Sequence, residues 1–430
     1  MQFRRSEKPG GQHMRLLRET VATRPSTFRG GDLHEGWMLY RWDTEAGRVV
    51  LAYPVREGLG MVMPSASLLD ELAADAAALA VVEADYNIPH GPSLEAVDAA
   101  APDMPYGTTW KLLGRVLGHP APYWHSRVRD PELMAEWKPG APTLKVPARV
   151  TPDLGPLLRL AAEEPDGSHA AAAALDTARR AVWDEATGAL EQIARYVDAS
   201  EDIDSIAVAA RPLRPHPPED IAEEILRDGW KMILARPDVL AARCARLGQV
   251  LGANRYFPGA CEITVDPSSC AEAAQWASRL QPSPRTALAT YLGDTGEQQI
   301  LIDPLTDMPA VHTRDGAIET LAPQRLPTIS PLATLTIGHG AVWVRTQDGT
   351  VFLAPQVMKG GNYTYGYGGG GPRALAKLID TLLDDITNPA PDYGAEQPSP
   401  GLVHATQEGW KGRTPPFTLT RGELDDLRAR

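Results

Sequence analysis

Glycine and proline interrupt this chain so often that loops must make up much of it. Among 430 residues there are 38 glycines and 39 prolines, and both residue types punctuate regular structure. The segments between them show the two-residue spacing of strands and the three- and four-residue spacing of helices. Hydrophobic residues make up 43% of the chain, which is typical of globular proteins and not of disordered ones. The length corresponds to two or three domains, and we expect an α+β fold.

Two distant stretches resemble each other and read as β-hairpins. One runs from Gly36 to Val55 and the other from Gly340 to Val357; with two extra residues in the first turn, Gly, Arg, Gly, Val, Leu, Ala and Val coincide. Each precedes a helical pattern, Leu68–Glu83 or Pro372–Ile386, which would cover one face of the hairpin. Duplication and chance explain the likeness equally well, because alternating Val and Leu around a glycine turn is common.

Helical spacing recurs through the middle of the chain, and strand-like runs follow it. We expect helices at Thr108–Leu117, Pro156–Ala162, Ala170–Ala199, Pro218–Leu234, Pro237–Leu251 and Ala271–Leu280. We expect strands at Cys261–Val265, Thr286–Leu292, Gln298–Asp303, Ala333–Ile337, Ala341–Thr346 and Thr350–Pro355. Prolines near the start of several of these helices suit the first helical turn.

The expected α+β fold has an N-terminal β-hairpin/helix unit, a mainly helical middle and a C-terminal antiparallel β module that ends in a glycine loop and a helix. The parts that we expect are a basic N-terminal arm (1–35), a hairpin-helix domain (36–119), a Pro-rich connection (120–156), a mainly helical domain (157–284), a β and glycine-loop domain (285–387) and a Pro/Gly-rich tail (388–430). Changes of spacing and of proline and glycine density set these boundaries.

Charge is distributed unevenly. Lys plus Arg is 42 and Asp plus Glu is 55, so the formal net charge is −13. Residues 1–29 carry seven basic and two acidic groups, a net charge of +5, which leaves −18 for the rest. Segments 57–110 and 378–410 hold nine and six acidic residues without any Lys or Arg. They could bind a basic partner protein or the basic arm, or form solvated surface. So acidic a body lacks the positive footprint that broad nucleic-acid binding needs.

The sequence offers no membrane span and no secretory signal. There is no long apolar run, and segment 1–29 lacks the apolar core of a signal peptide. The three cysteines, Cys244, Cys261 and Cys270, are odd in number and too far apart for a CxxC pair. We therefore expect neither a disulfide framework nor a cysteine-based zinc site, and a cytoplasmic protein without membrane association.

The most distinctive segment is a run of glycines and tyrosines before a helix. It reads Lys359-Gly-Gly-Asn-Tyr-Thr-Tyr-Gly-Tyr-Gly-Gly-Gly-Gly-Pro372, and it is called the glycine loop below. Backbone N–H groups at a helix start bind anions, glycines admit a ligand closely, and tyrosines stack on rings. The candidate ligand-binding residues are Lys359, Tyr363, Tyr365, Tyr367, Gly368, Gly369, Gly370, Gly371 and Arg373. The expected ligand is a small anion or a nucleotide, although neither a P-loop nor a dinucleotide fingerprint is present. The alternative is a purely structural strand-to-helix turn.

The hairpin, the Tyr365–Pro372 segment and the helix from Leu375 onward together resemble a small family of uncharacterised bacterial and phage domains. That family pairs a short hairpin with an aromatic-Gly-Tyr-Gly-x-Gly-Pro segment and an Ala/Leu helix, and it often has Trp where this chain has Tyr365. The match covers about 50 residues, Leu335–Ile386. It implies a fold and a mobile-element context, and it implies no activity.

No complete catalytic signature is present, and two weaker groups of side chains are candidate metal sites. His119 and His125 lie close enough in sequence to hold a metal with a nearby carboxylate. Asp380 and Asp384 lie on one face near the end of a helix, where a solvated surface is the simpler interpretation.

We interpret the chain as a cytoplasmic accessory binding or interaction protein of a mobile-element or defence system, whose glycine loop holds a small anionic ligand. The alternative is a metal-dependent enzyme that acts on a nucleotide or a nucleic-acid end. The sequence names no cofactor and does not decide whether the protein is an enzyme.

Overall fold

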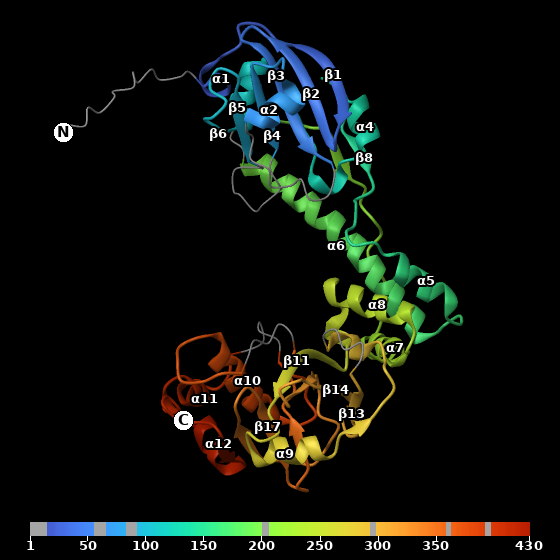
Figure 1. Cartoon of the computed structure of the whole chain (residues 1–430), viewed down its shortest axis with the longest axis vertical. Helices are drawn as coiled ribbons and strands as arrows, with labels where there is room; N and C mark the ends of the chain where they lie inside the picture. The colour runs from blue at the N-terminus through green and yellow to red at the C-terminus, as the bar shows by residue number, and fades with distance from the viewer. Residues whose placement is uncertain are drawn as a thin grey trace, which may run out of the picture. The chain divides into compact units, whose positions relative to one another are not determined.

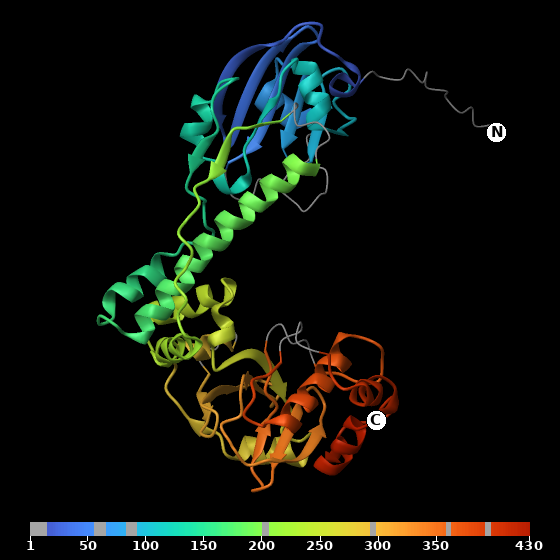
Figure 2. The same cartoon turned by 180° about the vertical axis from the view of Figure 1, so that it is seen from behind.

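The structure, a computed structural model, describes residues 15–55, 66–82, 93–199, 206–292, 298–357, 363–391 and 397–430. The fold is α+β, as the sequence predicts, with helices beside sheets whose strands are mostly antiparallel. The chain forms two compact units (Figures 1 and 2). Unit 1 comprises residues 1–151 and 180–218, and unit 2 comprises residues 152–179 and 219–430. The division falls within the 31-residue helix α6 (His169–Ala199).

Unit 1 is built on a six-stranded sheet with the order β1-β2-β3-β4-β5-β6. The strands are β1 (Thr27–His34), β2 (Trp37–Thr44), β3 (Gly47–Pro54), β4 (Ala78–Val82), β5 (Leu94–Asp98) and β6 (Tyr106–Thr108). Neighbours are antiparallel except β3 and β4, which are parallel and have α2 (Ala66–Ala73) between them in the chain. The remaining elements are α1 (Leu16–Glu19), α3 (Trp110–Leu117), β7 (Ala121–Tyr123), the 3₁₀ turn η1 (Ser126–Val128), α4 (Pro131–Glu136), β8 (Leu144–Val146), β9 (Ile206–Val208) and β10 (Ala210–Pro212).

Both faces of this sheet are buried, because alternate residues of its central strands point to opposite sides. Leu39 and Val50 belong to an apolar cluster with α2, whereas Tyr40 and Leu51 belong to a cluster with α1, α3 and α4. Burial on both faces explains why the central strands read as nearly continuous apolar runs.

One predicted helix of unit 1 is wrong in its second half. The sequence predicts a helix over Leu68–Glu83, but α2 ends at Ala73 and residues 78–82 form β4. A short apolar run does not reveal by its spacing whether it is a buried strand or a buried helix. The predicted helix at Thr108–Leu117 is confirmed as α3, and Thr109 caps it by accepting a hydrogen bond from the Leu112 N–H at 3.3 Å.

Unit 2 contains two antiparallel sheets and most of the helices. Its first sheet has the order β11-β15-β14-β13-β12 and its second the order β18-β17-β16-β19. The strands are β11 (Gly259–Val265), β12 (Gln281–Pro282), β13 (Ile300–Asp303), β14 (Met308–His312), β15 (Ile318–Pro323), β16 (Leu332–Ile337), β17 (Val342–Thr346), β18 (Val351–Leu353) and β19 (Phe417–Thr420). The helices are α5 (Gly155–Glu163), α7 (Glu223–Ala235), α8 (Val239–Val250), the 3₁₀ turn η3 (Ala253–Tyr256), α9 (Ala271–Ser278), the 3₁₀ turn η4 (Leu288–Tyr291), α10 (Gly370–Asp384), α11 (Pro400–His404), the π-turn η6 (Ala405–Gly409) and α12 (Arg421–Arg428).

The two sheets of unit 2 lie between two groups of helices. Val311 and Leu321 of the first sheet pack with α5, α7 and α8, and Ala310 and Ala322 pack on the other side with α9 and the second sheet. The opposite face of the second sheet, which includes Leu335, packs against α10, α11 and α12. Figures 1 and 2 both show these three C-terminal helices gathered around that sheet.

Sheet pairing joins segments that the sequence assigns to different parts. Strand β11, from the expected helical region 157–284, pairs with β15, and β19, from the expected tail 388–430, pairs with β16. The expected Pro-rich connection 120–156 contains β7, η1, α4 and β8, and the expected strand Thr286–Leu292 is the turn η4. Pairing between strands far apart in sequence decides which sheets β11 and β19 join, and local spacing does not report it.

The two similar hairpins are present as β2/β3 and β17/β18, but their registers differ. Arg41 pairs with Val50, on the face covered by α2, whereas the corresponding Arg345 pairs with Val351 and contacts Glu272 of α9, on the face opposite α10. A one-residue difference in register reverses the direction of every side chain of a strand. The side chains of the first strand therefore point to different faces in the two hairpins.

Candidate functional site

The glycine loop leads into a helix, as predicted. Helix α10 begins at Gly370, two residues before the predicted start, and buries Leu375, Leu378 and Leu382. Gly369 precedes it in extended conformation and offers no side-chain cap. The first N–H groups of α10 consequently have no side-chain acceptor from the cap residue, which leaves a positive helix end.

Two tyrosines of the loop are occupied by contacts within the protein. The Tyr363 hydroxyl donates to the Pro355 carbonyl at 2.7 Å, and the Tyr365 hydroxyl donates to the Arg413 carbonyl at 3.1 Å. The Tyr365 ring meets Phe417 edge-on, with centroids 5.3 Å apart. Burial raises the pKa of both hydroxyls. Tyr363 thus holds the loop against the segment that follows β18 in the second sheet, and Tyr365 holds it against the C-terminal segment.

The outward part of the loop is Tyr367, Gly368 and Arg373. Tyr367 is 49% exposed and its hydroxyl pairs with that of Thr364 at 2.8 Å. Gly368 and Arg373 are exposed, and Gly369, Gly370 and Gly371 are half-buried. Lys359, the remaining candidate, lies outside the described residues.

The acidic group on α10 is a solvated surface only in part: Asp384 is exposed, as expected, but the expectation is wrong for Asp380. This side chain is buried and accepts hydrogen bonds from the Ser399 N–H at 2.7 Å and from its hydroxyl at 2.8 Å. It also pairs with Arg428 Nε at 2.8 Å, and the same guanidinium reaches Asp384. Asp380 thus joins α10 to the start of α11 and to the end of α12, which the spacing of acids along one helix could not show.

The two histidines considered as a metal pair use their ring nitrogens elsewhere. His119 Nδ1 donates to the Pro120 carbonyl at 2.9 Å and Nε2 accepts from the Ser26 hydroxyl at 3.2 Å. His125 Nδ1 accepts from the Arg127 N–H at 3.2 Å and Nε2 donates to Gln192 at 2.7 Å. These bonds engage both nitrogens of each ring. Within the described ranges, no three His, Cys, Asp or Glu side chains are placed to bind one metal ion.

The three cysteines are free, and two of them are not activated. Burial raises the pKa of the Cys244 thiol to about 12 and that of Cys261 to about 11. Cys270 caps α9, where its sulfur accepts from the Ala273 N–H at 3.4 Å. A thiol whose pKa is raised in this way is a poor nucleophile at neutral pH.

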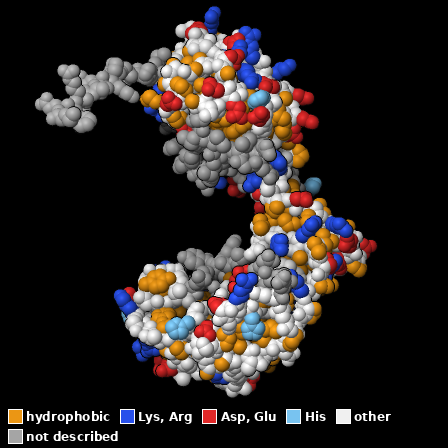
Figure 3. All heavy atoms as spheres, in the orientation of Figure 1, with side chains coloured by type: hydrophobic (Ala, Val, Ile, Leu, Met, Phe, Trp, Pro, Cys, Tyr) orange, Lys and Arg blue, Asp and Glu red, His pale blue; other side chains and the backbone are white. Residues whose placement is uncertain are grey.

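The described end of the basic arm packs on an acidic segment of unit 1. The Leu16 N–H donates to Asp98 at 2.9 Å, and Arg18 Nε donates to the Gly107 carbonyl at 2.8 Å. Arg15 and Arg18 both lie over the Tyr106 ring, at 5.3 and 5.6 Å from its centroid. Asp98 is therefore satisfied within the chain. Figure 3 shows side chains of both signs on the described surface of each unit.

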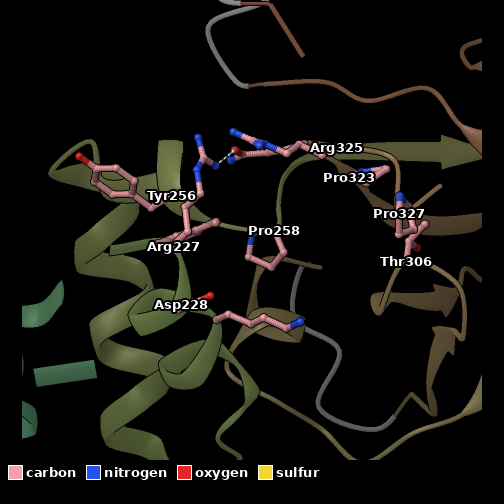
Figure 4. Close-up of a pocket in the computed structure, with 11 residues that line it drawn as sticks. Arg227, Asp228, Tyr256, Pro258, Thr306, Pro323, Arg325 and Pro327 are labelled. Carbon is pink, nitrogen blue, oxygen red and sulfur yellow. Dashed lines mark hydrogen bonds between the residues drawn. The ribbon is translucent and has the colours of Figure 1, made fainter. Parts of the chain in front are cut away.

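A cationic pocket in unit 2, which the sequence reasoning missed, has a volume of about 210 Å³. It lies between α7 and the segment that follows β15, as Figure 4 shows. Helix α7 buries Leu226, Trp230 and Ile233 against the core and turns Arg227 and Lys231 toward the pocket. These cations are four residues apart and so share a face of the helix, a pattern that could have been noticed in the sequence.

The pocket carries more positive than negative charge. Its lining includes Arg227, Lys231 and Arg325 and one acid, Asp228. Arg227 pairs with Glu223, whereas Lys231 and Arg325 make no ion pair or side-chain hydrogen bond with any described residue. Unneutralised cations around a cavity create a positive potential that attracts anions.

The segment just before the glycine loop contacts the wall of the pocket. Pro323, in the pocket wall, accepts a hydrogen bond from the Gln356 N–H at 2.9 Å, and Tyr363 is bonded to Pro355. Gln356 thus contacts the pocket wall three residues before the glycine loop begins, and Tyr363 is tied to the residue that precedes Gln356. The residue pattern suggested an anion site in this region, but the side chains that line the cavity come from other elements.

Comparisons of the chain with protein-family models, with curated proteins and with solved structures found no match. None of the described helices combines the length and the apolar character needed to cross a bilayer.

Proposed function

We propose that this protein is an accessory binding protein whose unit 2 holds a small anionic ligand in the cationic pocket. The observation that carries the proposal is the pair Lys231 and Arg325, which lie on the pocket without a partner among the described residues. Two long, flexible cations gain more from an anionic ligand than from water alone when a third, Arg227, is already fixed beside them.

The glycine loop is the second part of the proposal. Its exposed Tyr367 and Arg373 and the uncapped start of α10 are features that favour anions. Because Gln356 is bonded to the pocket wall, we propose that the loop contributes to the same ligand site. Tyr363 and Tyr365 serve in this proposal to position the loop.

Thermal unfolding of the full chain in phosphate and in chloride, at equal ionic strength, tests the proposal. At a phosphate concentration ten times the dissociation constant, ligand binding stabilises the folded state by about 1.4 kcal/mol. For a unit of this size that corresponds to a rise in Tm of about 3–6 °C. Substitutions Lys231→Gln and Arg325→Gln should reduce the rise, and the double substitution should abolish it.

Arg314→Gln is the matched control, because Arg314 is an exposed arginine of unit 2 that does not line the pocket. It should leave the phosphate-dependent rise unchanged. Arg373→Gln separates the two parts of the proposal. If the phosphate-dependent rise in Tm is unchanged in this variant, the glycine loop is not part of the anion site and the pocket alone remains the proposed site. A rise that survives in the Lys231→Gln/Arg325→Gln protein would refute the pocket as the anion site.

A further inference from the structure

We infer that the ligand of the cationic pocket is a small phosphomonoester, whose phosphoryl group contacts the basic side chains and whose carbon body packs against the prolines. This inference rests on the proposed function, because it names the class of anion that the same pocket holds. Charge, the bonding of Arg227 and the apolar part of the lining each support it.

The charge of the lining matches a dianion. Lys231 and Arg325 contribute two positive charges that no described residue pairs, whereas Arg227 is paired with Glu223 and the Asp228 carboxylate lies 3.7 Å from His169 Nδ1. A phosphomonoester carries about −1.5 to −2 charges at pH 7 and three strong acceptor oxygens. A carboxylate or sulfonate carries only one charge and would leave part of the positive potential uncompensated.

Arg227 is held in place by Glu223, and the rest of its guanidinium is weakly bonded. Glu223 accepts from Nη2, while Nη1 makes only long contacts, 3.3 Å to the Arg255 carbonyl and 3.4 Å to Gln324 Oε1. Its Nε is buried without a hydrogen-bond partner in the described part of the chain. Gln324 is itself buried and fixed, because its Nε2 donates to the Asn254 carbonyl at 2.6 Å. A positioned guanidinium with long bonds gains much from a short, charge-assisted bond to an oxyanion.

The rest of the lining is largely apolar. Pro258, Pro323 and Pro327 border the cavity together with the buried Phe257, and Figure 4 shows the three prolines around the same space as Arg227 and Arg325. The volume of about 210 Å³ is below the roughly 300–1,000 Å³ of clefts that bury drug-sized ligands. A ring or short chain with one phosphoryl group suits this volume, and a dinucleotide does not.

Calorimetric titration of the full chain at pH 7.5 and low salt with three matched probes tests the inference. Phenyl phosphate has the dianion and the ring, inorganic phosphate lacks the ring, and benzenesulfonate has the ring with a single charge. We expect phenyl phosphate to bind about tenfold more tightly than either of the others, because only it uses both parts of the pocket.

Substitutions divide the two contributions. Lys231→Gln should weaken phenyl phosphate and inorganic phosphate by similar factors, about tenfold each. Pro327→Ser should weaken phenyl phosphate and leave inorganic phosphate unchanged, and Arg314→Gln should change neither.

The outcomes distinguish this inference from the proposed function. Equal affinities for phenyl phosphate and inorganic phosphate would refute the claim that the ligand's carbon body packs against the prolines. Equal affinities for phenyl phosphate and benzenesulfonate would refute the claim that the pocket selects a dianion. In both cases anion binding at the pocket would stand. If none of the three probes binds, or if Lys231→Gln binds them as the wild type does, the proposed function fails and this inference fails with it.

Discussion

Asp303 joins the two sheets of unit 2, and its replacement by Asn is a direct test of how that unit is held together. The carboxylate lies at the end of β13 and is 1% exposed. It accepts hydrogen bonds from Arg279 Nε at 2.8 Å and Nη2 at 2.6 Å, and from Trp276 Nε1 at 3.1 Å. The remaining Nη1 of Arg279 donates to the Val351 carbonyl in the second sheet. The Asp303–Arg279 pair therefore links the first sheet, α9 and the second sheet.

The expected cost follows from the charge that Asp303→Asn leaves behind. Removing one partner of a buried ion pair costs about 3–5 kcal/mol. The side chain of Arg279 is 18% exposed, so water can solvate it in part, and we expect the lower end, about 3 kcal/mol. In a unit of this size that lowers Tm by about 6–12 °C.

Differential scanning calorimetry of the full chain measures this change. Asp307→Asn is the matched control, because Asp307 is exposed and has a φ of 58°, a conformation that Asn adopts readily. It should shift Tm by less than about 1–2 °C. In the double variant Asp303→Asn/Arg279→Met no charge is left unpaired, so its cost should be smaller than the sum of the two single costs by about 1–3 kcal/mol.

Two results would refute this reasoning. One is a Tm for Asp303→Asn that equals the Tm of the Asp307→Asn control. The other is a pair of single-variant costs that simply add in the double variant, since additive costs mean that the two side chains are not coupled.

Three further changes have definite expected outcomes. Gly366 has a φ of 86°, a left-handed conformation that disfavours a side chain, whereas Gly368 does not have a positive φ and has open space at its Cβ position. In chemical denaturation Gly366→Ala should therefore lower the free energy of unfolding by about 1–2 kcal/mol, and Gly368→Ala should leave it almost unchanged. Equal losses in the two variants would contradict these backbone conformations. Burial and the neighbouring Glu319 raise the pKa of Glu262, so the folded state binds its proton more tightly than the unfolded state, and the stability from this group is lost as pH rises through the folded pKa. Glu262→Gln should accordingly raise Tm at pH 7.5 more than at pH 4, and the opposite ordering would show that the sign is wrong. The buried Cys244, with its pKa raised to about 12, should react with iodoacetamide at pH 8 only when the protein is unfolded by guanidinium, and rapid labelling of the folded protein, mapped by mass spectrometry, would contradict its burial.

Elements with a strong local signature could be predicted from the sequence. The helices α8, α9 and α10 lie within a few residues of the predicted ranges because their apolar residues recur at helical spacing and proline or a capping residue marks their starts. The hairpins β2/β3 and β17/β18 have glycines at their turns, such as Gly47 and Gly349, with φ of 113° and 86°. These are properties of neighbouring residues, and neighbouring residues are what a sequence pattern records.

Elements that depend on distant partners could not be predicted in the same way. The apolar run Ala78–Val82 is a strand because β3 and β5 lie on its two sides, and the same run could have continued a helix. The C-terminal segment contributes a strand because β16 offers it a free edge. Asp380 is buried because Ser399 and Arg428, from two later elements, supply its hydrogen bonds.

The candidate site divides along the same line. The sequence by itself determined that a glycine-rich turn leads into α10, because glycine, proline and the apolar stripe act locally. Only the tertiary structure decided which cations line the pocket. Arg227 and Gln324 are 97 residues apart in the chain, and they meet because the packing of α7 against the first sheet of unit 2 brings the end of β15 beside it. The charged side chains of the pocket are therefore brought together by the packing of apolar faces, and a sequence pattern does not reveal which apolar faces will meet.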